Sequence, residues 1–294
     1  MKDLYLIAEI SKQGHSQALK REQSVREKEP VYLGLIDQVR SFHPGMGLRS
    51  IYEQFEPEGI GRDSFISLGL REGYRLRVFQ SPIKTTRRVP SRRYRNLLEK
   101  IELTNVNQVW VSDITYYQLE ESHYYIVLLM DLYSRRLIGY SGANNMRASN
   151  NIAALKMAFT LRGVKNYKNK LIHHSDRGSQ YTSDDYTGLL LDRGIQISMC
   201  SNVLENAHCE RVNGTIKNDY LRRWKVKSAP KFFRKLPKAV ENYNNRIHRS
   251  LSKMSPIQFE TYTQNLEPDK RRKMTVFTEK KQQLNPNQLN LFNE

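Results

Sequence analysis

Residues 108–224 alternate between strand-like and helix-like patterns, and this order limits the folds open to the chain more than any other feature. VWVSDITYY (109–117) is rich in β-branched and aromatic residues, and HYYIVLLMDLYS (123–134) is a nearly continuous apolar run. RRLIGYSGAN (135–144) follows after a short turn. Together these patterns predict a three-stranded antiparallel meander whose middle strand is buried.

The following residues predict further strands and helices in alternation. Helices are expected over 148–161, 182–193 and 204–224, and strands over KLIHHSD (170–176) and GIQISM (194–199). Right-handed crossover connections would place the fourth strand beside the first. The predicted fold is therefore α/β: a mixed five-stranded sheet with flanking helices, the ribonuclease H-like topology.

The chain divides into six expected segments. Apolar stripes separated by glycine-containing breaks predict a helix-turn-helix module before the core, for which a purely structural three-helix bundle is the alternative. Arginines and two prolines indicate a basic linker after it. The segments are an N-terminal helical segment (1–31), the helix-turn-helix DNA-binding module (32–82), the basic linker (83–104), the catalytic core (105–228), a C-terminal helical extension (229–265) and a polar tail expected to be disordered (266–294).

The distribution of charge favours a nucleic-acid partner. The formal net charge is +18, yet residues 101–210 hold 10 Lys/Arg against 11 Asp/Glu. Residues 1–100 hold 19 against 12, and residues 211–294 hold 19 against 7. A near-neutral centre between basic arms suits a catalytic core with polyanion-binding appendages. A solvated basic surface is the alternative.

Composition also bears on where the protein acts. No run of eighteen apolar residues is present, so no membrane span is expected. The two cysteines, Cys200 and Cys209, form no CxxC pair, which disfavours a disulfide framework or a structural zinc site. We expect a cytoplasmic, nucleoid-associated protein.

Three acidic residues are placed where the predicted fold could bring them together. Asp113 lies within the first predicted strand, Asp176 at the carboxyl end of the fourth, and Glu210 on the last long helix. Neighbouring strands would bring both aspartates to one edge of the sheet, and the helix can pack across that edge. Converging carboxylates predict Mg²⁺ or Mn²⁺, with two ions, as in phosphoryl transfer. Separately, each acid could instead cap a turn or form an ion pair.

Several motifs resemble the integrase core of bacterial insertion-sequence transposases. They are WVSDITYY, DLYSRRLIGY, HHSDRGSQYTS, ENAHCERVNGTIK and YNNRIHRSLSKMSPIQF, and they extend from about residue 108 to residue 259. The set is similar to the second-frame, OrfB-type product of the IS-three family, within the retroviral integrase superfamily. Residues 32–80 also resemble the helix-turn-helix module that precedes that core.

The resemblance implies a DDE transposase with Asp113, Asp176 and Glu210 as catalytic and metal-binding residues. It implies metal-dependent cleavage at the ends of an insertion sequence followed by strand transfer, with terminal-repeat and target DNA as substrates. It further implies a dimer or larger homo-oligomer and an upstream-frame product as a possible fusion partner. Thirty-three residues separate Asp176 from Glu210 here, against 35 in the family, so the loop before Glu210 is shortened.

Glu205 is the rival to Glu210 for the third acid. Five residues at 100° each put the two about 140° apart on a helix, so only one can face the aspartates. Asn206, Glu210, Asn213 and Lys217 share one helical face, which favours Glu210 and predicts that the two amides and the lysine contact DNA.

Other predicted DNA contacts are arginines in the basic segments. They are Arg87, Arg88, Arg92 and Arg93 in the linker and Arg222 and Arg223 after Glu210. Two alternatives to a transposase remain at this stage: a related nuclease that cuts without joining, and a DNA-binding protein that has lost catalysis.

Overall fold

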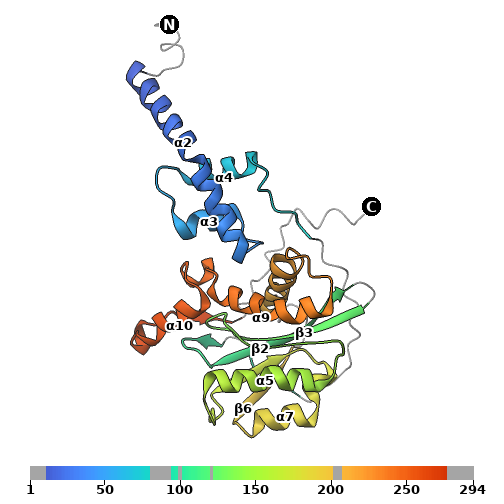
Figure 1. Cartoon of the computed structure of the whole chain (residues 1–294). Coiled ribbons are helices and arrows are strands. Elements are labelled where there is room, and N and C mark those ends of the chain that lie inside the picture. The colour runs from blue at the N-terminus through green and yellow to red at the C-terminus, as the bar shows by residue number, and fades with distance from the viewer. Residues whose placement is uncertain (1–10, 80–93, 99–100, 120–121, 201–206, 277–294) are drawn as a thin grey trace, which may run out of the picture.

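The computed structural model describes residues 11–79, 94–98, 101–119, 122–200 and 207–276. These residues form a helical module followed by a layered α/β core (Figure 1). The module lies against the C-terminal helices, those helices cover one face of a sheet, and further helices cover the other face. The layers follow from the sequence pattern, because a sheet with apolar residues on both faces requires cover on both sides.

The helical module consists of α2 (Lys12–Phe42), α3 (Leu48–Phe55) and α4 (Arg62–Arg71). Its core contains residues of the apolar stripes in the sequence, among them Tyr32, Ile36, Ile51 and Phe65. The three helices are those expected between residues 32 and 73, and they bury a small core of their own.

The first helix extends further than the sequence pattern suggested. One continuous helix of 31 residues, α2, passes through the expected segment boundary at residue 31 and includes Pro30. Ser11 caps it, since its side chain accepts a hydrogen bond from the Gly14 N–H. The expected boundary at residue 31 therefore falls inside one helix, which continues into the apolar stripe that packs in the module.

The core contains the predicted mixed five-stranded sheet, in the order β4-β3-β2-β5-β6. Pairing is antiparallel between β2, β3 and β4 and parallel between β2, β5 and β6. This order puts the fourth core strand beside the first and confirms the ribonuclease H-like fold class. The strands are β2 (Val109–Leu119), β3 (Ser122–Asp131), β4 (Leu137–Ala143), β5 (Leu171–Ser175) and β6 (Ile195–Met199).

Helices cover the two faces of the sheet and enclose two separate cores. On one face α5 (Ala148–Arg162) and α7 (Asp184–Leu191), with the short α6 (Ser179–Thr182), pack around Trp110. On the other face lie α8 (Ala207–Gly214), the π-helix η2 (Thr215–Leu221) and α9 (Ala229–Asn245), which pack around residues such as Val111. The shorter C-terminal elements are η3 (Arg249–Leu251), α10 (Pro256–Gln264) and η4 (Pro268–Lys270).

The helix expected over 182–193 is confirmed as α7, which begins after Ser183 in an extended conformation and is preceded by the short α6. One helix prediction was wrong in detail. The long helix expected over 204–224 becomes a π-helix from Thr215 onward, where Arg222 N–H donates to the Lys217 carbonyl, 2.8 Å away. Tertiary packing decides such local departures from the regular α-helical period.

Parts of the expected linker and tail belong to the core. Leu98 and Leu103 are fully buried, and the short strand β1 (Glu102–Leu103) pairs with β7 (Met274–Thr275). Val276 is also buried, so residues 268–276 are folded and the expectation of a disordered tail was wrong for them. Apolar residues within these polar stretches explain the difference, because they complete the core beside α9. The remainder of the expected tail, 277–294, lies outside the described residues.

Within the described ranges, none of the helices has the length and apolar character that crossing a membrane requires.

Candidate active site

Strand register brings Asp113 and Asp176 to the same level of the sheet. The parallel pairing of β2 with β5 joins Trp110 to His173 and Val111 to His174. The paired residues end there, two positions before Asp113 on β2 and two before Asp176, which directly follows β5. Neighbouring strands are about 4.8 Å apart, so a register continued by two residues would set the two aspartates side by side at the carboxyl end of β5.

Asp176 is in a largely desolvated environment. Burial raises the pKa of its carboxyl above the ordinary value, and a hydrogen bond from the Gly178 N–H opposes that rise. This bond is 3.0 Å long and fixes Oδ1 of Asp176. A buried carboxylate of this kind favours a proton or a cation as its counter-charge.

The buried side chain of Tyr181 lies close to both aspartates. Its hydroxyl is 2.8 Å from Oγ of Ser112, the residue before Asp113. Burial raises the pKa of Tyr181 well above its usual range, and the neighbouring Tyr186 and the charges of Asp176 and Asp113 raise it further.

The helix α8 faces Asp113 through Asn213. The Asn213 amide donates from Nδ2 to Oδ2 of Asp113 over 2.7 Å, and the Asn213 side chain is buried. Oδ1 of the same amide is buried without a hydrogen-bond partner. One turn further along, Nζ of Lys217 donates to Thr115 Oγ1, 2.7 Å away, on the same face of β2 as Asp113. An amide and an ammonium thus flank the Asp113 carboxylate.

Glu210 lies on α8 three residues before Asn213, and its side chain is partly buried. Residues three apart on a helix are neighbours, so Glu210 belongs to the turn that faces the aspartates. Among the residues with described coordinates, however, no three His, Cys, Asp or Glu side chains converge closely enough to hold a metal ion. The structure therefore places Asp113 and Asp176 at the ends of paired segments of β2 and β5 and Glu210 one helical turn before Asn213, without closing a three-carboxylate cluster. Glu205, the rival acid, lies outside the described residues.

The donor chemistry at this edge fits a hard divalent cation. Asp113 and Asp176 supply carboxylate oxygens, and the Asn213 Oδ1 is a buried acceptor that lacks a donor. Mg²⁺ and Mn²⁺ prefer such oxygen ligands. Like charges also disfavour convergence of three carboxylates unless a cation lies between them.

The histidines that precede Asp176 are buried structural residues. His174 contacts Ser198 Oγ at 2.8 Å and Cys200 Sγ at 3.2 Å, while His173 contacts the Tyr186 hydroxyl at 2.9 Å. Burial lowers the pKa of His173 to about 3 and that of His174 to about 4. Both rings are therefore neutral near pH 7 and fix the end of β5.

The expected DNA contacts have mixed outcomes. Asn213 and Lys217 face β2, as described above, and Arg222 and Arg223 lie over the Phe79 ring, 5.5 and 5.2 Å from its centroid. Arg223 also donates to the Arg77 carbonyl over 2.8 Å, so it joins the core to the end of the helical module. The remaining predicted contacts, Asn206, Arg87, Arg88, Arg92 and Arg93, lie outside the described residues.

Sequence reasoning missed Tyr181, Ser112 and the Gly178 N–H as neighbours of the aspartates. Tyr181 and Ser112 are 69 residues apart in the sequence and meet only because α6 follows the strand that lies beside β2. Gly178 had a local signal, since a glycine two residues after an aspartate can place its N–H against the carboxylate.

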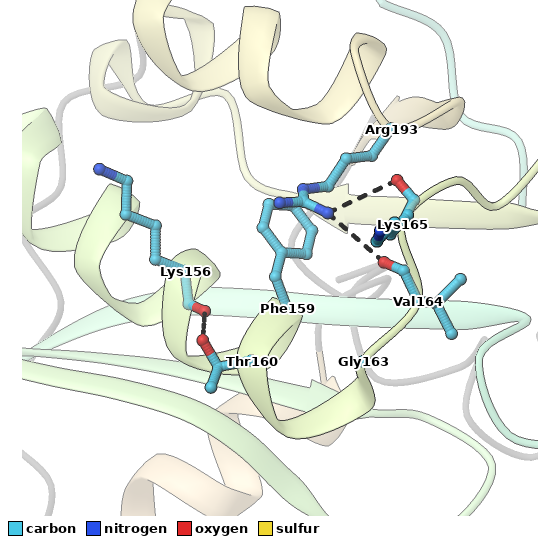
Figure 2. A pocket seen from close by; sticks show the side chains of 7 residues that line it. All are labelled: Lys156, Phe159, Thr160, Gly163, Val164, Lys165 and Arg193. Atoms are coloured by element: carbon cyan, nitrogen blue, oxygen red, sulfur yellow. Dashed lines mark hydrogen bonds between the residues drawn. The ribbon is translucent and has the colours of Figure 1, made fainter.

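A surface pocket of about 450 Å³ lies away from these residues, where α5 ends and β5 and β6 begin. Figure 2 shows Arg193 over the Phe159 ring and bonded to the carbonyl oxygens of Val164 and Lys165. Asp176 follows the opposite end of β5, so the pocket is at the other edge of the sheet. Its Arg193 has intramolecular partners, and the pocket contains none of the predicted catalytic residues.

Comparison with known proteins identifies related sequences and structures. Residues 104–202 match the integrase core domain family. The insertion element IS600 uncharacterized 31 kDa protein of Shigella sonnei is 30% identical over 264 residues, which cover 85% of this chain and 94% of that protein. The transposase for insertion sequence element IS904 of Lactococcus lactis is 31% identical over 57% of this chain and 67% of that protein.

A solved structure, the HTLV-2 integrase catalytic core domain in complex with magnesium, aligns with 56% of this chain and 99% of that one, at 20% identity and a TM-score of 0.43. The relative that aligns along nearly its whole length, together with the integrase core match, shows the family. The chain belongs to the insertion-sequence transposases and carries their integrase core domain.

Proposed function

We propose that the protein cleaves DNA at the ends of an insertion sequence and joins the freed 3′ ends to target DNA, using Asp113, Asp176 and Glu210 to hold divalent cations. The observations that support the proposal are the parallel pairing of β2 with β5, which ends two residues before Asp113 and Asp176, and the bond from Asn213 of α8 to Asp113. Membership of the transposase family supports the same reaction class.

Each residue has a distinct role in this proposal. Asp113 and Asp176 bind the cations from the sheet, and the Gly178 N–H and the Asn213 amide hold the two carboxylates in position. Mg²⁺ or Mn²⁺ ions bound there supply activation of a hydroxyl and stabilisation of the leaving oxygen, as in other two-metal phosphoryl transfers. Lys217, on the same face of β2, supplies positive charge to a DNA phosphate near Asp113.

Glu210 would complete the ligand set with the two aspartates. It lies on the same helix as Asn213, which bonds Asp113. A divalent cation held by the aspartates would offset the repulsion between the three carboxylates.

The helical module and the basic segments hold the DNA. Two ends of an element must be held together for transfer, which favours a dimer or larger assembly, and a fused upstream-frame product could add further DNA contacts. Arginines and lysines in the flanking segments supply the phosphate contacts.

Cleavage of duplex DNA tests the catalytic assignment. The substrates are duplexes taken from the DNA that flanks the gene on both sides, incubated with the full chain and Mg²⁺. We expect cleavage by the natural protein and a loss of roughly 10³-fold or more in Asp113→Asn, Asp176→Asn and Glu210→Gln, because metal ions contribute several kcal/mol to phosphoryl transfer. Duplex binding should remain.

Asp192→Asn is the matched control, because Asp192 is an exposed aspartate of the same core. It should cleave as the natural protein does. Cleavage that persists in Asp113→Asn would reject the assigned site, and binding without cleavage by the natural protein would identify a non-catalytic DNA-binding protein.

Pre-cut ends separate a transposase from a nuclease. Duplexes with a recessed 3′-hydroxyl, mixed with a supercoiled plasmid, should become covalently joined to that plasmid in Mg²⁺. Hydrolysis of the flanking duplexes without any joined product would leave a ribonuclease H-like nuclease as the function.

A further inference from the structure

The helix that carries Glu210 continues without a break into the segment that contacts the helical module. Gly214, between α8 and η2, keeps helical torsions (φ −58°, ψ −45°), so the two form one rod. Near the middle of this rod Asn213 bonds Asp113, and towards its C-terminal end Asp219 and Tyr220 face the module. A contact at the far end can therefore influence the position of Glu210.

The contact with the module is a close approach of two backbones. The turn that follows α2 contains Gly45, and a Cβ added to Gly45 would lie 2.5 Å from the Cα of Asp219 and closer still to its Cβ. Only a residue without a side chain fits there. Gly45 does not have a positive φ, so the fit, and not the backbone conformation, requires glycine.

Hydrogen bonds fix the same turn on the core. Nδ1 of His43 is 3.1 Å from the Tyr220 hydroxyl, and the Asn242 side chain of α9 donates to the Phe42 carbonyl over 2.5 Å. Arg246 holds Asp219 from the core side with a 2.9 Å bond. Burial and the charge of Arg246 lower the pKa of His43 to about 4, so this contact involves a neutral ring near pH 7.

The rim of this interface is made of exposed ion pairs. Glu53 bonds both Nε and Nη2 of Arg249, at 2.9 and 3.0 Å, and Glu56 pairs with Lys253 at 3.2 Å. Exposed pairs of this kind contribute little individually. A polar interface between two parts of one chain permits relative motion of those parts. The close fit at Gly45 therefore decides whether the module is docked on the rod.

The docked segment is also the π-helical part of the rod. A π-helix is rare and occurs often at functional sites, because it changes the direction of the side chains that follow it. Lys217, which bonds Thr115 beside Asp113, and Tyr220, which contacts His43, both lie in η2. The docking contact and the active-site lysine therefore depend on one stretch of backbone.

We propose that the turn His43–Met46 is a positioning element of the active site, by which the docked helical module holds the rod α8–η2, and with it Glu210, in register with Asp113 and Asp176. This proposal rests on the proposed function for its catalytic consequence. DNA bound by the module would then be held at a fixed distance from the aspartates, so docking sets the position of cleavage.

Gly45→Ala separates the module from the rod without altering either core. Its matched control is Gly47→Ala, two residues away, where an added Cβ meets nothing within 4 Å. In the full chain without DNA, we expect the hydrogen-exchange rates of the amides in 207–221 to rise by about ten-fold or more in Gly45→Ala. The added methyl group overpacks the contact with Asp219 and releases the module from the rod. Gly47→Ala should exchange as the natural protein does.

If Gly45→Ala does not fold, reversal of the charges of one rim ion pair tests the proposal instead. Glu53→Arg and Arg249→Glu should each raise exchange in 207–221 by about two-fold, and the double variant should restore it, because the pair is re-formed in reverse. Unchanged exchange in Gly45→Ala, or single and double rim variants that behave alike, would overturn the proposal.

Cleavage gives the second readout. With the flanking duplexes and Mg²⁺, Gly45→Ala should lose cleavage at the natural position by about ten-fold and cut at additional positions, with duplex binding retained. Cleavage at the natural position and rate would also overturn the proposal. If the natural protein cuts no duplex, the proposed function fails, while the exchange measurement still decides whether the module positions the rod.

Discussion

At the scale of single residues, Asn213 changes role between sequence and structure. Its place on the predicted face with Glu210 suggested a DNA contact, yet its amide bonds Asp113 and its side chain is 4% exposed. An amide that holds a metal-binding carboxylate acts on the geometry and basicity of that ligand. We therefore interpret Asn213 as a positioning residue for Asp113.

Asn213→Ala tests this interpretation. We expect cleavage of the flanking duplexes to fall by about 10–100-fold, the usual cost of removing a group that orients a metal ligand, with a higher Mg²⁺ requirement. Duplex affinity measured without metal should stay unchanged. An exposed amide on the core, Gln196, provides the control substitution Gln196→Ala. Loss of duplex affinity without a change in the Mg²⁺ requirement would restore the DNA-contact role.

At the scale of elements, a buried charge cluster joins the C-terminal helices to the sheet. Glu260 of α10 accepts from Arg162 of α5 at 2.6 Å and from Arg136 at 2.6 Å, and Ser134 also donates to it. Asp131, at the end of β3, accepts from the same Arg162 at 3.2 Å. Burial raises the pKa of Asp131, although the charge of Arg162 opposes the rise. Burial would also raise the pKa of Glu260, but its bonds from Arg162, Ser134 and Arg136 lower it below the ordinary value.

Glu260→Ala should destabilise the core strongly. Removal of Glu260 leaves the buried Arg162 guanidinium with Asp131 as its remaining acidic partner and deprives Arg136 of its bond to Glu260, and losses at buried ion pairs cost up to about 3–5 kcal/mol. Urea denaturation at pH 7 measures the free energy of unfolding. Glu267→Ala is the control, because Glu267 pairs with Lys270 at an exposed site and should cost less than about 1 kcal/mol. Equal effects of the two substitutions would show that α10 is not held by this cluster.

At the scale of the whole molecule, positive charge is concentrated in the two flanks of a near-neutral catalytic centre. The structure uses some of that charge internally, since Arg222 and Arg223 lie over Phe79 and Arg246 bonds Asp219. Exposed lysines of the same region, such as Lys227, remain on the surface. The DNA-binding surface is therefore smaller than the formal charge suggests.

The affinity for duplex DNA should depend steeply on salt. A protein that neutralises 6–10 phosphates loses about 10³–10⁵ in affinity between 50 and 200 mM salt. Titration of a fluorescent duplex at several salt concentrations gives the slope, and Lys227→Gln should reduce it by about 0.9 if this lysine contacts one phosphate. Lys168→Gln, an exposed lysine at the opposite edge of the sheet from the aspartates, is the control. An affinity that does not change with salt would contradict an electrostatic duplex-binding surface.

The sequence alone determined the element order and, through it, the topology of the sheet. Apolar runs and the alternation of apolar with polar residues are local patterns, so they were enough to place the strands and most helices. Three acids on the expected elements then identified the candidate site. Asp113, Asp176 and Glu210 stay a prediction as catalytic residues.

Only the tertiary structure decided which side chains meet. The Asn213 bond to Asp113, the contact of Tyr181 with Ser112 and the approach of Gly45 to Asp219 join residues 69 to 174 positions apart, and no local pattern encodes such pairs. The π-helix at η2 and the burial of Leu98 and Val276 likewise depend on packing against distant elements. Periodicity determines which face of a helix or strand is apolar. Which other helix or strand packs against that face depends on how all the elements of the chain pack together.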